Sequence, residues 1–205
     1  MLDALMLINQ AVAVYGDTPV QSLGEETPGG QSVALLYDRR LDFNLGIYPW
    51  SFAKKLFALS LDNQTTPYSG FEHVHLLPAE RLEAPDYVTN DITSDSARFH
   101  RYTIIDGRVH SNETGLYALC RYRVEPIAMS AAFRAAHVQS LAADLCRART
   151  GNKALSSELM DEAYGPPSEA YMGGMMGAAR RADGFGTPPR TQDRSQNPLE
   201  QARWY

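Results

Sequence analysis

"GIYPWSFAKK", residues 46–55, marks the point at which the sequence changes from a helical to an extended pattern. Before this stretch, apolar residues recur every four positions, which predicts a helix over 28–48. Pro49 disfavours helical geometry in the residue that precedes it, so we expect this helix to end near Tyr48. The ring of Trp50 is large enough to bury a wide apolar area. We interpret Pro49 and Trp50 as a structural corner that anchors the following chain against the helices.

Three further helices are expected outside this corner, because apolar residues recur there at spacings of three and four. They cover about 2–15, 126–150 and 153–164. The long helix over 126–150 is rich in alanine, which has the highest helix propensity. One face of that helix carries Phe133, His137, Leu141 and Leu145.

Residues 51–124 show the patterns of short strands. FEHVHLLP (71–78) places its side chains alternately on two faces, and GLYALCRYRV (115–124) does the same. Between these stretches, Asp106-Gly107 is flanked by strand-forming residues, which is the strongest hairpin signal in the chain. We therefore expect a small antiparallel sheet in this region.

These patterns predict a mainly α fold, an antiparallel helical bundle with a small antiparallel β-sheet or hairpin region. The core is expected to cover 1–164. Residues 165–205 contain six glycines and five prolines, which is typical of weakly ordered chain, so we expect an extended C-terminal arm there. Apolar and basic side chains of this arm are candidates for binding a partner surface. They are Met172, Met175, Met176, Arg180, Arg181, Trp204 and Tyr205.

Composition narrows the classes of function. The chain has 205 residues, 44% of them hydrophobic, and a net charge of −5, so it has no basic surface for sequence-specific nucleic-acid binding. Cys120 and Cys146 are too few for a disulfide framework and are expected to be reduced thiols in a cytosolic protein. No apolar run is long enough to predict a membrane span, and the first residues do not resemble a signal peptide.

Motifs for chemistry are weak. His73 and His75 would share one face of a strand, as the ligands of some zinc sites do. No third ligand lies at a suitable spacing, so two ordinary strand histidines are the better interpretation. The sequence has no GxSxG, HExxH or GxxxxGK[ST] motif, and no GxGxxG motif after a strand. We expect no enzyme activity, no metal and no cofactor.

A series of short motifs near the N-terminus resembles the tail tubular protein A family, the head-to-tail adaptors of short-tailed phages. Tyr15-Gly16 lies at a turn, PVQSL (19–23) follows it, and Leu36-Tyr37 lies in the expected second helix. Tyr48-Pro49-Trp50 with Phe52 is similar to the corner of that family.

Later segments continue the same order, which is the specific part of the resemblance. LPAE (77–80), the hairpin around 106–112 and LAADL (141–145) are similar to family segments. The resemblance covers about 1–165 and, more loosely, 178–188. The chain departs from the family pattern where Tyr48 replaces a histidine and Glu80 replaces an aspartate.

The resemblance implies a structural virion protein that forms a ring, expected to be a dodecamer, between the portal protein and a downstream tail or nozzle protein. Genomic DNA would pass through the lumen of the ring without sequence-specific binding, and no membrane would be involved. Negative charge on the lumen wall would keep the DNA from adhering. The subunit would assemble in the host cytoplasm and reside in the neck of the virion, with its arm bound to the portal.

Two alternatives remain open on the sequence. The first is a monomeric neck or completion protein, or another partner-binding module, which would differ from a ring-forming adaptor in its mass with and without the portal. The second and less favoured alternative is a metal-dependent hydrolase built on His73 and His75 with a distant acid. Metal content after purification would separate this alternative from the other two.

Overall fold

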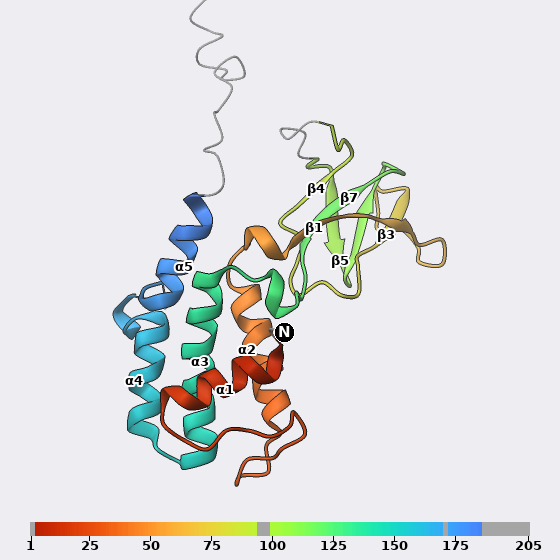
Figure 1. The fold of residues 1–205 in the computed structure, drawn as a ribbon. Coiled ribbons are helices and arrows are strands. Elements are labelled where there is room, and N and C mark those ends of the chain that lie inside the picture. The colour runs from red at the N-terminus through yellow and green to blue at the C-terminus, as the bar shows by residue number, and fades with distance from the viewer. Residues whose placement is uncertain (1–2, 94–98, 170–171, 186–205) are drawn as a thin grey trace, which may run out of the picture.

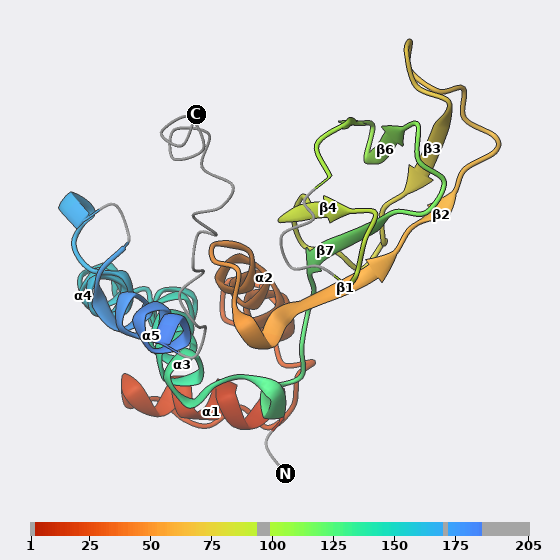
Figure 2. The same cartoon turned by 90° about the horizontal axis from the view of Figure 1, so that it is seen from above.

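Helices and strands occupy separate halves of the molecule (Figure 1). In this computed structural model, the structure describes residues 3–93, 99–169 and 172–185. The same division is visible in the second view, where the strands lie to one side of the helices (Figure 2). The chain passes from the helical half to the sheets after α2 and returns before α3.

The helical half is built around α3 (Ala131–Thr150), which contacts four other helices. These are α1 (Ala4–Val14), α2 (Val33–Gly46), α4 (Lys153–Tyr164) and α5 (Gly174–Phe185). Three short 3-10 turns lie in the connections between elements. They are η1 (Ser51–Ala53), η2 (Pro126–Ala128) and η3 (Pro167–Glu169).

Local sequence explains where α3 and α4 begin and end. Ser130 caps α3, because its Oγ accepts a hydrogen bond from the backbone N–H of Phe133 at 3.2 Å. Gly151 ends α3 in the left-handed conformation, with φ of 69°. Asn152 then caps α4 by accepting from the backbone N–H of Leu155 at 3.1 Å. Two residues are therefore enough to reverse the chain between the two helices.

The strands form two antiparallel sheets. One has three strands in the order β1-β7-β4, and the other has four in the order β2-β3-β6-β5. The hairpin of β5 and β6 turns at Asp106 and Gly107, which both have the positive φ that such a turn needs. The strands are β1 (Lys54–Ala58), β2 (Ser60–Leu61), β3 (His73–Leu76), β4 (Tyr87–Thr89), β5 (Tyr102–Ile105), β6 (Arg108–Ser111) and β7 (Tyr117–Arg121).

Each half buries its own apolar cluster. The larger cluster lies among the five helices and includes Trp50, Phe133 and Leu141, each fully buried. The smaller cluster lies within the β half and includes Val88, Val109 and Leu116. The two halves therefore have separate cores, which are joined by the connecting chain, by polar contacts, and by Leu82 and Tyr122, which pack against the helical cluster.

The expectation of a mainly α fold is wrong. Helix accounts for 44% and strand for 18% of the described residues, so the fold is mixed α and β and not a helical bundle with one small sheet. The strands contain only two to five residues each. Strands this short show little alternation, so the sequence pattern predicted one sheet where the structure has two.

Some element boundaries also differ from the predicted ones. The helix predicted over 28–48 begins at Val33, because the backbone N–H of Thr27 bonds to Gln31 O at 2.8 Å and closes a turn before it. The helix predicted over 126–150 begins at Ala131, after the separate turn η2. Within the predicted arm, α5 packs against α3 and α4. Among the described residues, no helix has the length and apolar character to cross a membrane.

Candidate functional site

The corner of Pro49 and Trp50 directs the chain from α2 to β1. Trp50 is fully buried, and its indole N–H donates to the carbonyl oxygen of Asn44 at 2.8 Å. Its ring meets the rings of Tyr48 and Phe133 edge-on, with centroids 4.8 Å apart in both pairs. These contacts fix the direction in which the chain leaves the helical half.

Helix α5 is attached to the same corner. The backbone N–H of Ser51 donates to Asp183 Oδ2 at 3.0 Å, and its hydroxyl donates to Oδ1 at 2.6 Å. At the other end of α5, Gly174 has a positive φ, and a Cβ added there would lie 2.5 Å from the carbonyl oxygen of Glu162. Only glycine fits at that contact, so the glycines of this segment allow close packing as well as chain freedom.

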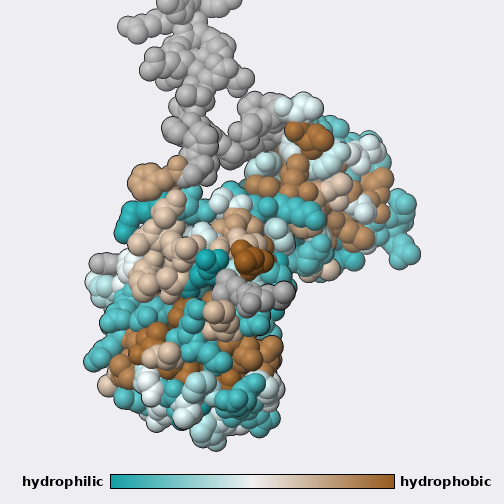
Figure 3. Space-filling model, viewed as in Figure 1, coloured by the Kyte–Doolittle hydropathy of each residue, from teal (hydrophilic) through white to brown (hydrophobic). Residues whose placement is uncertain are grey.

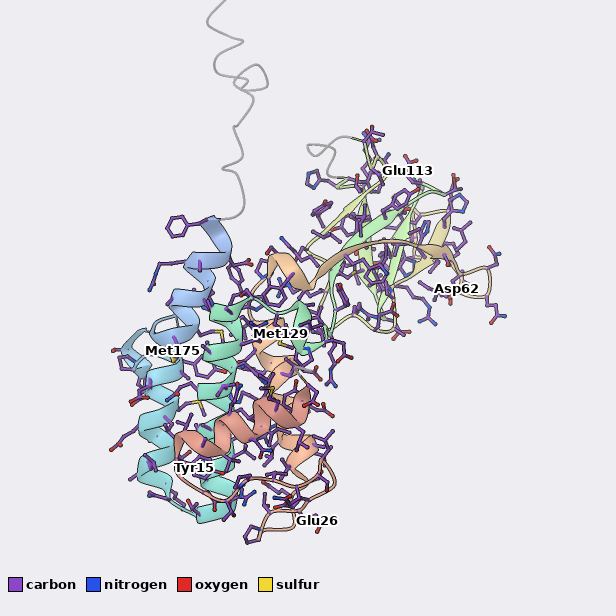
Figure 4. The ribbon with its side chains drawn as sticks, in the orientation of Figure 1. Tyr15, Glu26, Asp62, Glu113, Met129 and Met175 are labelled. Atoms are coloured by element: carbon purple, nitrogen blue, oxygen red, sulfur yellow. The ribbon has the colours of Figure 1, made fainter. Side chains whose placement is uncertain are left out.

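The structure separates the predicted arm residues into two groups. Met176 is fully buried and Arg180 is 9% exposed, so these two do not present the accessible surface that was expected of them. Met172 is 62% exposed and Arg181 is also exposed. Met175, which is labelled in Figure 4, is 38% exposed. Trp204 and Tyr205 lie outside the described residues.

Arg180 is buried without a carboxylate among the described residues. One of its terminal N–H groups donates to Met172 Sδ at 2.7 Å, and its guanidinium carbon lies 6.0 Å from the centroid of the Tyr48 ring. Its Nε has no hydrogen-bond partner there, and burial lowers the pKa of this arginine. A thioether sulfur is a weak acceptor, so a carboxylate that reached Arg180 would be a better partner.

A buried polar network connects α2, α3 and α4. Asn44 Nδ2 donates to Ser140 Oγ at 2.9 Å and to His137 Nδ1 at 3.0 Å. The hydroxyl of Tyr164 donates to Asn44 Oδ1, and Arg40 donates to the same hydroxyl at 3.2 Å. Burial first, and then the positive charge of Arg40, lower the pKa of His137 to about 3. The neutral imidazole therefore belongs to the folded core.

Sequence reasoning missed this network, although one signal for it was present. His137 falls on the apolar face of its helix, and Asn44 lies between Leu41 and Leu45 at buried positions. Polar residues at buried helical positions predict partners on a neighbouring helix. Which neighbour supplies them is a tertiary property that the local pattern does not contain.

Two arginines at the end of β7 join the halves. Arg123 donates to Asp42 at 2.7 and 2.9 Å and to Asp38 at 2.9 Å, and both acids lie on α2. Arg121 donates to Asp86 Oδ1 at 2.6 Å and also to the carbonyl oxygen of Gly46 at the end of α2. These contacts hold the three-stranded sheet against α2.

Between α2 and α3 lies a groove of about 470 Å³ that the sequence did not suggest. We call it the arginine groove, defined by Gln31, Leu36, Arg39, Asp144 and Arg147. Arg40 donates one hydrogen bond of 2.7 Å to each carboxylate oxygen of Asp144. The groove therefore has more positive than negative charge available to solvent.

The predicted pair of histidines does not form a metal centre. His73 and His75 lie on one face of β3, but His75 is fully buried and its Nε2 lies 2.8 Å from the carbonyl oxygen of Glu113. Burial lowers the pKa of His75. Across residues 3–93, 99–169 and 172–185, no three His, Cys, Asp or Glu side chains are grouped to hold a metal ion.

Comparison with known proteins adds no family: no protein-family model matches this chain, and no curated protein matches it.

Proposed function

We propose that this protein is a head-to-tail adaptor of a short-tailed phage, a structural virion protein that forms a ring between the portal and the tail. The observation that carries the proposal is the ordered set of motifs over 1–165 that resembles the tail tubular protein A family. As such an adaptor, the protein would form a dodecameric ring and assemble in the host cytoplasm. A downstream tail or nozzle protein binds its other side.

Contacts among the resembling motifs support the proposal. Asn9 lies on α1, and its side chain exchanges two hydrogen bonds of 2.7 and 3.0 Å with the backbone of Val20 in the PVQSL motif. Trp50, from the corner motif, packs against Phe133 in the centre of the helical half. These two motifs are therefore attached to the packed helices, as a subunit repeated around a ring requires.

Exposed groups on α5 support docking to the portal through the C-terminal segment. Met175 and Arg181 on α5 and Met172 just before it are accessible, and Trp204 and Tyr205 follow in the sequence. The net charge of −5 suits a lumen through which DNA passes without adhering.

Cryo-electron microscopy of the chain mixed with the portal of the same phage tests the proposal. The expected result is a second ring of density beneath the portal. A bare portal beside monomeric protein would favour the monomeric neck or completion protein instead. Truncation after Phe185 is the sharper test of the C-terminal segment, because α5 packs on the core and should remain. The truncated chain should fold and lose affinity for the portal.

A further inference from the structure

The arginine groove has surplus positive charge on its rim. Arg39 is 67% exposed, and its nearest carboxylate is Asp144 at 3.7 Å, which Arg40 already holds. Arg147 is also exposed and forms no ion pair within the described part of the chain. Both guanidinium groups therefore keep N–H donors that can bind acidic groups from outside.

Apolar side chains extend this surface along α2. Leu35 and Phe43 are 67% and 50% exposed and lie four residues before and after Arg39. Residues at this spacing lie on one side of a helix. The groove and this stripe together offer an apolar surface with arginines at its centre, which is the composition of many protein–protein contacts.

A surface of opposite character lies where the N-terminal end of α1 comes close to η2 (Figure 2). We call it the acidic face, defined by Asp3, Met6, Glu125 and Ile127. Met6 and Ile127 are 47% and 72% exposed. Asp3 caps the N-terminus of α1 and Glu125 directly precedes η2, and both charges act on Tyr37 together with the opposing charge of Arg123. Neither acid forms an ion pair with a described residue.

Figure 3 shows the side of the molecule that carries α1 and α5, where apolar side chains lie among hydrophilic ones. The acidic face is a mixed surface, because it combines the exposed side chains of Met6 and Ile127 with two carboxylates. The arginine groove has the same mixture with the opposite charge. The two surfaces belong to one packed set of helices, so a contact between them requires a second copy.

We propose that the acidic face of one copy binds the arginine groove of a second copy. The contact would pair Glu125 or Asp3 with Arg39 or Arg147, and it would cover Ile127 and Met6 with Leu35 and Phe43. Each copy contributes a different surface, so the contact is heterologous and can close into a ring. The inference rests on the proposed function for its ring, but the contact itself depends only on the two surfaces.

Disulfide trapping in the full-length chain tests the contact. Arg39→Cys and Ile127→Cys are placed in separate preparations. Cys120 and Cys146 are buried in the fold, so neither should compete for the cross-link. The mixture is oxidised with and without the portal. We expect cross-linked heterodimers about tenfold above a mixture of Arg39→Cys with Tyr68→Cys, because docking raises the local thiol concentration. Tyr68 is 58% exposed in the β half and serves as the matched control.

A second experiment uses the double variant Arg39→Cys/Ile127→Cys, which carries both cysteines in one chain. A heterologous contact predicts a ladder of dimers, trimers and larger species. Homodimers alone, or cross-linking no higher than in the Tyr68→Cys control, would overturn the inference. A ring seen beneath the portal without this cross-link would leave the adaptor function standing and reject only this interface. A cross-link without any ring at the portal would reject the function and keep the contact.

Discussion

Asp183 on α5 accepts two hydrogen bonds from Ser51, a residue 132 positions earlier at the corner that follows α2. The pair connects the last described helix to the point where the chain leaves the helical half. It also explains why residues that the sequence assigns to a loose arm are packed on the core. The glycine content alone could not reveal this, because close packing and chain flexibility both favour glycine.

Loss of this pair should release α5. We expect Asp183→Ala to lower the free energy of unfolding by about 1 kcal/mol and to increase amide hydrogen exchange in 174–185. Arg181→Ala is the control, since that side chain is exposed on the same helix. Equal exchange in the two variants would show that the Ser51 contact does not hold α5.

Removal of the corner tryptophan should destabilise the whole helical half. Trp50→Ala should cost about 3–5 kcal/mol, because it leaves a cavity beside Phe133. Trp50→Phe keeps most of the ring but leaves the carbonyl of Asn44 without its donor, at a cost of about 1–3 kcal/mol. Urea unfolding measures both. If Trp50→Ala cost less than Trp50→Phe, packing at the corner would not be the main contribution.

The buried histidine should make stability fall in mild acid. The pKa of His137 is about 3 in the folded protein and 6.5 without burial, so between these values the unfolded chain binds the extra proton. Stability from this group is complete above pH 6.5 and is lost as the pH falls toward 3, by at most about 1.4 kcal/mol per pH unit.

His137→Gln should reduce that slope, and unfolding curves at several pH values would measure it. His75 also has a lowered pKa, so part of the slope should remain in this variant. His100→Gln is the control, because that histidine is exposed. The same slope in His137→Gln and in the unmodified chain would contradict the assignment.

Two arginines of the helical half should respond in opposite ways to the same substitution. Arg40 holds both oxygens of Asp144, so Arg40→Met leaves this carboxylate with only the longer contact of 3.7 Å to Arg39 and should cost about 3 kcal/mol. Arg180 has no carboxylate among the described residues, so Arg180→Met should leave stability unchanged or raise it by up to about 2 kcal/mol. Thermal unfolding of the two variants measures both changes.

Helix periodicity was sufficient to place α1, α2 and α3 near their positions, because each buries one regular apolar face. The β half was harder to predict. Strands as short as β2 and β4 contain too few residues to show alternation, and their pairing partners lie far away in sequence. The hydrogen bond from Arg121 to the carbonyl oxygen of Gly46 joins positions 75 residues apart. The arginine groove forms only where α2 and α3 lie side by side. Such features depend on tertiary packing, which local patterns do not encode.

Charge reversal should disrupt and then restore the contact between copies. Arg39→Glu should weaken self-association about tenfold, or about 1.4 kcal/mol, because it places an acid opposite Glu125. Glu125→Arg alone should weaken it similarly. The double variant Arg39→Glu/Glu125→Arg should recover association, since each new pair is again of opposite sign. Sedimentation at low and high salt measures the effect, which screening should reduce. Arg101→Glu, in the β half, serves as the control, and failure of the double variant to recover would mean that these two residues do not meet.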